Sequence, residues 1–155
     1  MFNIFNKITV KYKKIKEKAT IFTRGTEFSA GLDIYALLEN KSGKICIKPH
    51  TTEMIPTGIT TEMPEGTVGL IFPRSGLATK QGLRLANCVA VIDSDYRGEW
   101  FIPIHNDTNK SKYIFDKDRV AQVIFIKYPK VKLRKADKLS LTKRGIKGFG
   151  STGSK

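Results

Sequence analysis

The sequence has few of the residues that build covalent or metal-based frameworks. Its two cysteines, Cys46 and Cys88, lie far apart and form no Cys-x-x-Cys pair, which argues against a disulfide framework and against a zinc site. Its two histidines, His50 and His105, belong to no ligand cluster. No apolar run is long enough to span a bilayer or to act as a signal peptide. We therefore expect a soluble, unprocessed cytoplasmic protein without a membrane partner.

Acidic residues are also scarce, with 14 Asp and Glu against 28 Lys and Arg, so the net charge is +14. Residues 1–20 hold six lysines and one acid, and residues 127–155 hold ten basic residues and one acid. The region between them carries equal numbers of acids and bases. This distribution is compatible with anionic ligands, with a polynucleotide or simply with a solvated surface. Nucleic acid is an option but not the expected partner.

Patterns typical of helices are rare, whereas short stretches of alternating apolar residues recur at 8–12, 45–48, 68–72 and 120–125. Close-set turn signals separate these stretches. At 155 residues the chain is long enough for one core. The sequence therefore predicts one all-β sandwich or barrel. A single short helix is expected at 75–82, with Ser75 as its cap and Gly82 closing it.

From Thr142 onward the apolar periodicity stops and glycine becomes frequent. A segment with so little to bury is not expected to hold itself folded. We therefore divide the chain into a β-barrel domain, 1–141, and a flexible C-terminal arm, 142–155.

The first chemical signal follows the stretch 68–72, where Arg74, Ser75 and Gly76 come directly after Pro73. A helix start offers free N–H groups, glycine lets the backbone approach a ligand, and arginine binds phosphate oxygens in a bidentate fork. This pattern is typical of an anion cradle. Taken alone, it fits a helix cap beside a surface arginine better.

A second signal lies in 84–99, which we interpret as a β-hairpin with a polar pocket. Asp93 ends an apolar run, so its carboxylate would be partly desolvated and oriented, whereas Asp95 lies in the turn and is expected to be structural. Asp93 is therefore the candidate general base. The competing interpretation is a turn-capping aspartate.

The arm supplies a third signal. Arg144 could bind another phosphate, Phe149 could stack on a base, and Gly150 and Ser151 could contact phosphate oxygens. A phenylalanine between glycines in such a segment is not expected to pack into a hydrophobic core. We therefore expect the arm to bind the ligand and to act as a lid over it.

Five stretches in this order resemble the homotrimeric dUTPase family, and together they cover about residues 29–153. They are 30–36 (AGLDIYA), 73–78, 90–99, 119–122 (RVAQ) and 144–153. Two positions depart from the family pattern, Ala90 and Lys147, where that family usually has glycine. Neither departure touches a catalytic group, and Lys147 could add a phosphate contact.

The resemblance implies a distorted jelly-roll-like β-barrel subunit, with one short helix and a flexible C-terminal arm. Three subunits would build shared active sites. It also implies hydrolysis of dUTP to dUMP and pyrophosphate with Mg²⁺ on the triphosphate, which limits uracil in DNA and supplies dUMP for thymidylate synthesis.

The residue roles implied by the resemblance fall into four groups. Arg74, Ser75, Gly76 and Gln122 would hold phosphates. Asn87 with Val91 and Ile92 would read uracil, and Tyr96 would pack on the deoxyribose. Asp33 would contact the water shell of Mg²⁺ without binding the metal directly. Asp93 would orient the attacking water, and the arm residues Arg144, Phe149, Gly150 and Ser151 would close over the nucleotide.

Two other functions compete with this interpretation. A dCTP deaminase of the same fold would need an acid/base group beside the cytosine, for which Glu99 is the nearby candidate. A nucleotide-sensing regulatory protein would use the pocket to switch a partner, without turnover.

Overall fold

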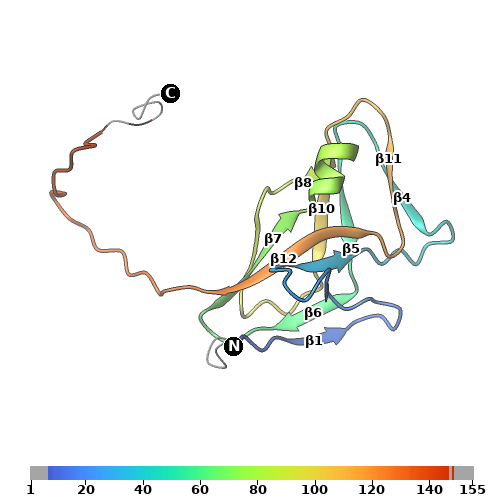
Figure 1. Ribbon diagram of the computed structural model, residues 1–155, viewed down its shortest axis with the longest axis horizontal. Coiled ribbons are helices and arrows are strands. Elements are labelled where there is room, and N and C mark those ends of the chain that lie inside the picture. The colour runs from blue at the N-terminus through green and yellow to red at the C-terminus, as the bar shows by residue number, and fades with distance from the viewer. Residues whose placement is uncertain (1–6, 147, 149–155) are drawn as a thin grey trace.

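Short strands and tight turns make up most of the chain and wrap around one core (Figure 1). The computed structural model describes residues 7–146 and Gly148. Its strands are β1 (Lys11–Lys14), β2 (Thr23–Arg24), β3 (Leu32–Tyr35), β4 (Lys44–Ile47), β5 (Thr52–Pro56), β6 (Ile59–Glu62), β7 (Thr67–Pro73), β8 (Leu83–Leu85), β9 (Ala90–Ile92), β10 (Phe101–Asn106), β11 (Lys112–Phe115) and β12 (Arg119–Lys127). One short helix, η2 (Leu77–Gln81), follows β7 within these residues. The predicted all-β class with one short helix is confirmed.

The strands form four antiparallel sheets. The largest has the order β2-β3-β12-β7-β9, a second has the order β5-β10-β8, and the pairs β1-β6 and β11-β4 complete the set. The longest ladder joins β12 to β7, from Ala121 opposite Pro73 to Lys127 opposite Thr67. Short antiparallel sheets that close around one core make the jelly-roll-like barrel that the sequence predicts.

The core consists of branched aliphatic side chains around one tryptophan. Trp100 is 1% exposed, and its ring centroid lies 5.2 Å from that of Phe22 and 6.2 Å from that of Phe125. Gly69 allows β7 to approach this ring, because a Cβ there would lie 3.1 Å from Trp100. The other largest fully buried side chains are those of Ile34, Ile47, Ile55, Ile59, Ile71, Leu83, Leu85, Ile102, Ile104, Ile114 and Val120. Each contributes about 1.5–3 kcal/mol by burial, so this cluster is the main source of stability.

The helix begins differently from the prediction. Ser75 and Gly76 are already helical, and the N-cap position at Gly76 has no side-chain hydrogen bond, so the predicted serine cap was wrong. The first turn is instead closed by the Ala78 N–H, which donates to the Arg74 carbonyl at 3.0 Å. Gly82 ends the helix in the left-handed conformation, with φ 66°, as predicted.

The stretch 84–99 is not a hairpin, contrary to the prediction. β8 pairs with β10, whereas β9 pairs with β7, so residues 86–89 cross from one sheet to another. The Ala86 N–H donates to the Pro103 carbonyl at 2.9 Å and keeps the start of the crossing on β10. Cys88 makes the turn possible with φ 58°. Apolar residues on both sides of a turn predict two strands, but not which strands they pair with.

Beyond Lys127 the chain leaves the barrel. The Tyr128 N–H donates to the Gly66 carbonyl at 3.0 Å. After that contact, residues 129–146 form no helix or strand and are exposed wherever the structure describes them. Figure 1 shows this segment running away from the sheets. The chain thus departs before Thr142, and the division into 1–141 and 142–155 stays a prediction. No helix within the described residues is long and apolar enough to span a membrane.

Gly58, in the turn between β5 and β6, provides a test of how closely this turn packs against Leu37 and Ala19. Its φ is 67°, and a Cβ there would lie 2.5 Å from Leu37 Cδ2 and 2.8 Å from Ala19 Cβ. We expect Gly58→Ala to lower the free energy of unfolding by about 2–4 kcal/mol, because left-handed strain adds to steric overlap. Urea unfolding measures the loss. Gly43→Ala is the matched control, since Gly43 has φ 58° but open space around it. Equal losses in the two variants would contradict the packing argument.

Candidate active site

A β-bulge in β12 determines which side chains reach the outer face of the large sheet. Arg119 pairs with Tyr35, but Ala121 pairs with Ile34 and the register shifts between them. Val120 and Ala121 are consequently both buried. In a regular strand, residues 119 and 122 would point to opposite faces. The extra residue reverses the alternation and brings Arg119 and Gln122 to the same face.

On that face the carboxylate of Asp33 holds two guanidinium groups. Asp33 Oδ1 lies 2.9 Å from Arg74 Nε, and Asp33 Oδ2 lies 3.1 Å from Arg119 Nη1. Arg74 Nη1 also donates to the Arg119 carbonyl at 3.2 Å. The Asp33 side chain is 13% exposed and that of Arg74 29%. Two cations against one anion leave a net positive charge with open donors, as an anion site requires.

Gln122 lies beside this cluster. It is directly opposite Asp33 on β3 and Phe72 on β7. Its Nε2 donates to the Pro73 carbonyl at 3.1 Å. A Cβ on Gly31 would lie 2.9 Å from Gln122 Oε1, so glycine at this position leaves room for the amide. An open hollow of about 550 Å³ adjoins these groups, lined by Ser29, Ala30, Gly31, Phe72, Pro73, Gln122 and Ile124.

Ser75 and Gly76 continue the cluster at the start of the helix. Both are exposed. A Cβ on Gly76 would meet nothing within 4 Å, so the backbone is open to approach there. The Ser75 carbonyl accepts a hydrogen bond from Thr79 Oγ1 at 2.7 Å. Among the described residues, the Ser75 hydroxyl has no partner and can face a ligand.

Asp93 lies at the end of β9, in a turn that is bonded within itself. The Tyr96 N–H donates to the Asp93 carbonyl at 3.2 Å, and the Tyr96 hydroxyl donates to the Glu99 carbonyl at 3.0 Å. A Cβ on Gly98 would lie 2.3 Å from the Tyr96 hydroxyl, so glycine allows the ring to fold over the turn. Asp93 is exposed, and Val91 is 60% exposed. The predicted desolvation of Asp93 is therefore not present in the single chain.

Asp93 and Arg74 lie at opposite ends of β7. β9 runs antiparallel to β7, with Ala90 opposite Ile71 and Ile92 opposite Gly69, so Asp93 continues toward the start of β7. Arg74 follows its other end. At about 3.3 Å per residue the two backbone positions are roughly 20 Å apart. The Arg74 guanidinium also points to Asp33 on β3, away from β9, because β3 and β9 lie on opposite sides of β12 and β7 in the five-stranded sheet.

Comparisons with known proteins agree on one family. The dUTPase family profile matches residues 17–153. A deoxyuridine 5'-triphosphate nucleotidohydrolase from Finegoldia magna is 45% identical over 81% of this chain and 85% of that relative. Another, from Desulfitobacterium hafniense, is 42% identical over 96% of this chain and 98% of that relative. The chain belongs to the dUTPase family. It is a hydrolase, and the resemblance found in its sequence is confirmed.

Solved structures of dUTPases have the same fold. The dUTPase of Staphylococcus bacteriophage 80alpha, solved with dUPNHPP, matches with a TM-score of 0.83 at 26% identity, over 94% of this chain and 98% of that chain. A dUTPase from phage phi11 of S. aureus matches with a TM-score of 0.73 at 22% identity and was solved with a structural Mg(II) ion. The jelly-roll-like architecture is therefore confirmed for this dUTPase.

The structure describes only some of the predicted arm residues. Arg144 is exposed in a turn in which the Gly145 N–H donates to the Thr142 carbonyl at 3.1 Å. Phe149, Gly150 and Ser151 lie outside the described residues, as does Lys147. Their predicted roles stay predictions.

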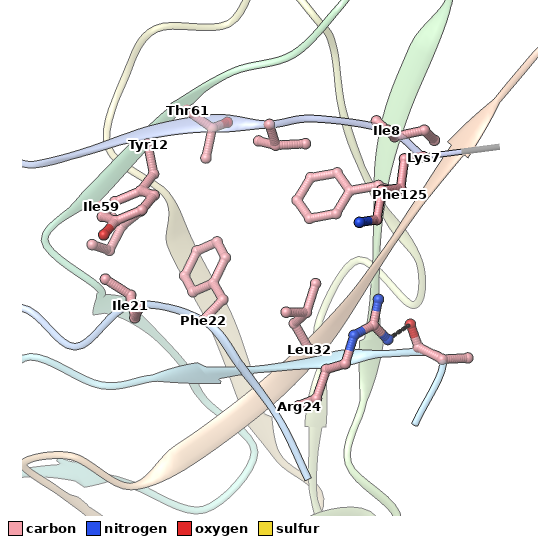
Figure 2. A pocket seen from close by; sticks show the side chains of 12 residues that line it. Lys7, Ile8, Tyr12, Ile21, Phe22, Arg24, Leu32, Ile59, Thr61 and Phe125 are labelled. Atoms are coloured by element: carbon pink, nitrogen blue, oxygen red, sulfur yellow. Dashed lines mark hydrogen bonds between the residues drawn. The ribbon is translucent and has the colours of Figure 1, made fainter. Parts of the chain in front are cut away.

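A second cavity, of about 450 Å³, contains none of the predicted site residues (Figure 2). Apolar side chains such as Phe22, Leu32 and Phe125 line it. At one side Arg24 donates to the Ala30 carbonyl at 3.2 Å and thereby fixes the loop that leads to Gly31.

Sequence reasoning assigned no role to Arg119, Gly31 or Gly98. Arg119 lies within the fourth quoted stretch, but its contact with Asp33 depends on a bulge that alternation alone does not reveal. Gly31 makes room for Gln122, and Gly98 makes room for Tyr96. In the sequence, the available signal for both was a glycine close to a predicted site residue.

Gly31 gives a direct test of this dUTPase's anion site. We expect Gly31→Ala to displace the Gln122 amide and to break its bond to Pro73, which costs about 1 kcal/mol of stability. Catalysis should suffer more, by about tenfold to a hundredfold in kcat/KM, because small displacements of positioning groups are costly. Pyrophosphate release and thermal unfolding measure the two effects. Gly25→Ala, where a Cβ meets only an ordinary 3.6 Å contact with Ser29 Oγ, should leave both unchanged. Unaltered kcat/KM in Gly31→Ala would contradict the assignment.

Proposed function

We propose that this protein hydrolyses dUTP to dUMP and pyrophosphate, through attack of water on the α-phosphorus with Asp93 as general base. The observation that carries the proposal is the guanidinium pair held by Asp33 beside Ser75 and Gly76, in a chain of the dUTPase family. The reaction limits uracil in DNA and supplies dUMP for thymidylate synthesis. We place it in the cytoplasm, with the nucleotide pool.

The triphosphate binds, in this proposal, at the end of β7. Arg74 retains donors that Asp33 does not use, and its fork suits phosphate oxygens. Ser75 offers its hydroxyl and Gly76 an open backbone. Gln122 lies next to them, with its amide fixed by the Pro73 carbonyl.

The nucleoside binds at the other group of residues. Val91 and Ile92 lie in the edge strand β9, and the Val91 side chain is exposed. Asn87 is exposed in the segment 86–89 that crosses between the sheets. These groups would read uracil. The Tyr96 ring, held by the Glu99 carbonyl and by the space at Gly98, would pack against the deoxyribose and leave no room for a 2'-hydroxyl.

One chain cannot bring these two groups together. Asp93 and Arg74 are separated by the length of β7 and face opposite edges of the sheet, whereas a reaction at one triphosphate needs both within contact distance. A second copy must therefore bring its Asp93 turn to the phosphate-holding end of the first. A ring of identical subunits closes such a head-to-tail contact, and we propose a homotrimer with shared active sites.

Mg²⁺ fits the site as a partner of the triphosphate. Asp33 is the one carboxylate in the phosphate-holding group, and both its oxygens already accept from arginines. No group of three potential ligands occurs among the described residues. In this proposal Asp33 would contact the metal's water shell, and phosphate oxygens would be the direct ligands of the ion. When bound, Mg²⁺ neutralises charge on the phosphates.

The arm 142–155 closes the site in this proposal. Arg144 adds a charge-assisted bond to the phosphates, Phe149 stacks on the base, and Gly150 and Ser151 contact terminal phosphate oxygens. Because residues 129–146 leave their own barrel, the arm that follows them would reach a site on a neighbouring copy. Closure would also exclude water other than the nucleophile.

Most of the rate acceleration comes from charge rather than from the base. An ordinary aspartate has a pKa near 3.9, so general-base catalysis supplies about 10²- to 10⁴-fold. Arg74 and Arg144 stabilise the charge on the α-phosphate and on the leaving pyrophosphate. Asp93 is exposed in one chain and would become partly desolvated only when a neighbour covers it.

The structure weakens the deaminase alternative. Glu99 Oε1 accepts a hydrogen bond from the Gly58 N–H at 2.8 Å, so its carboxylate serves the packing of β6. One oxygen of this carboxylate is therefore already engaged within the fold. A regulatory nucleotide sensor remains as the second alternative, and it would bind dUTP without needing Asp93 as a base.

Asp93→Asn provides the decisive test of the mechanism. We expect pyrophosphate release from dUTP to fall by about 10²- to 10⁴-fold, because the base is lost while the shape is kept. dUTP affinity, measured by calorimetry, should stay within about threefold, because the phosphate-holding residues are unchanged.

Asp95→Asn is the matched control, since Asp95 is also exposed in the same turn and should leave turnover intact. Wild-type turnover in Asp93→Asn would refute the assignment. Ammonia release from dCTP by the wild-type protein would favour the deaminase, and dUTP binding without pyrophosphate release would favour the sensor.

A further inference from the structure

The outer face of the large sheet is apolar between the two ends of the proposed site. Ile124 of β12 lies directly opposite Leu70 of β7, and Leu70 lies opposite Val91 of β9 on its other side. Phe72 is two residues along β7 from Leu70, and Ile126 is two residues along β12 from Ile124, so both project to the same side of the sheet. These five side chains form a continuous surface, which we call the outer patch.

The outer patch is separate from the core. The inner side of the same three strands supplies Ile71, Ala90 and Val123 to the core cluster. Within the described residues, no member of the outer patch belongs to a core cluster. Val91 is 60% exposed and Ile126 is 39% exposed, and the other three members are half-buried. An antiparallel sheet usually turns polar side chains to water on its outer face, so a continuous apolar patch there indicates a partner.

The position of the outer patch favours a second copy of the chain as this partner. Residues 129–146 run away from the sheets, so they do not cover the patch of their own chain (Figure 1). Leu70 lies in the middle of β7, between the end that leads to Arg74 and the end that lies beside Asp93. The proposed site needs a second copy that brings Asp93 to Arg74. A copy in that position has to lie along the surface between them, which is the outer patch.

The two ends of the outer patch carry opposite charge. At one end, Arg74 and Arg119 share the single carboxylate of Asp33. At the other end, the turn 93–99 contains three acids and one arginine, so acids still outnumber bases when Lys127 of β12 is counted with them. Unlike ends attract and like ends repel. The charges therefore favour a head-to-tail contact between copies over a two-fold one.

We propose that the outer patch is the surface on which a second copy of the chain docks, with the Asp93 end of one copy against the Arg74 end of the next. This inference rests on the proposed function, because the docked copy supplies the Asp93 turn that the Arg74 group of the first copy lacks. Burial of Leu70, Ile124 and Ile126 between the copies holds the two parts of the site together.

The test is the molar mass of the full-length protein in solution, measured by sedimentation equilibrium. We expect the wild-type protein to have about three times the chain mass of 17.4 kDa. Leu70→Lys and Ile124→Lys should each raise the concentration for half-assembly by about 100-fold or more, because each buries an unpaired charge in the contact. Pyrophosphate release from dUTP should fall as the protein dissociates and return as its concentration is raised.

Two further variants separate docking from folding. Ile126→Lys should also weaken assembly, and because Ile126 is 39% exposed in one chain, a lysine there can reach water without disturbing the fold. Phe115→Lys is the matched control, since Phe115 is an apolar residue of β11 that is 51% exposed and lies outside the outer patch. It should keep the mass and the pyrophosphate release of the wild-type protein. The fluorescence of Trp100, the chain's one tryptophan, shows whether each variant keeps its core.

Three results would overturn the proposal. A monomeric wild-type protein would assign the outer patch to another partner. Folded variants of the patch that keep the wild-type mass would place the contact elsewhere, for example on the exposed Val131 and Leu133. Equal dissociation of Phe115→Lys would mean that any added charge weakens assembly. The proposed hydrolysis fails separately: a wild-type assembly that dissociates through the outer patch but releases no pyrophosphate from dUTP would support the docking surface and refute the activity.

Discussion

Strand β7 is hydrogen-bonded to β12 along one edge and to β9 along the other, and this double pairing decides where each part of the site lies. Through β12 and β3 it places Arg74 beside Asp33 and Gln122. Through β9 it places Asp93 at the opposite end of the same strand. In the proposed function, each chain therefore carries two half-sites, and a neighbouring copy would complete each of them.

Each half-site is fixed by backbone features of modest size. The bulge at Val120 turns Arg119 and Gln122 to one face, where Asp33 neutralises part of the charge of two arginines without removing their remaining donors. On the other side, the missing Cβ of Gly98 lets Tyr96 fold back over its own turn. Both arrangements exist before ligand binds, which reduces the ordering that substrate must bring about. The remaining positive charge favours anionic ligands over neutral ones.

The sequence predicted the type and position of the strands well, but it did not predict which strands pair. Alternation placed the strands around 45–48, 68–72 and 120–125 close to where they lie, because one face of each is buried in a core that composition could predict. It could not show that β8 and β9 join different sheets, since a crossing and a hairpin need similar turn residues. Nor could it show the ion pairs of Asp33, which depend on a bulge and on residues far apart in the chain. Arg74 and Asp93 were recognisable individually, but their separation in one chain was not.

The central claim is that Asp93 and Arg74 of one site come from different copies of the chain. It is tested most directly by mixing two inactive variants, Asp93→Asn and Arg74→Gln, after unfolding and refolding them together in equal amounts. The account predicts that activity returns to about one quarter of the wild-type value, because random assembly gives that share of sites both native residues. Each variant refolded alone should remain inactive. A mixture no more active than its components would contradict the account, since it would mean that both residues of a site belong to one chain.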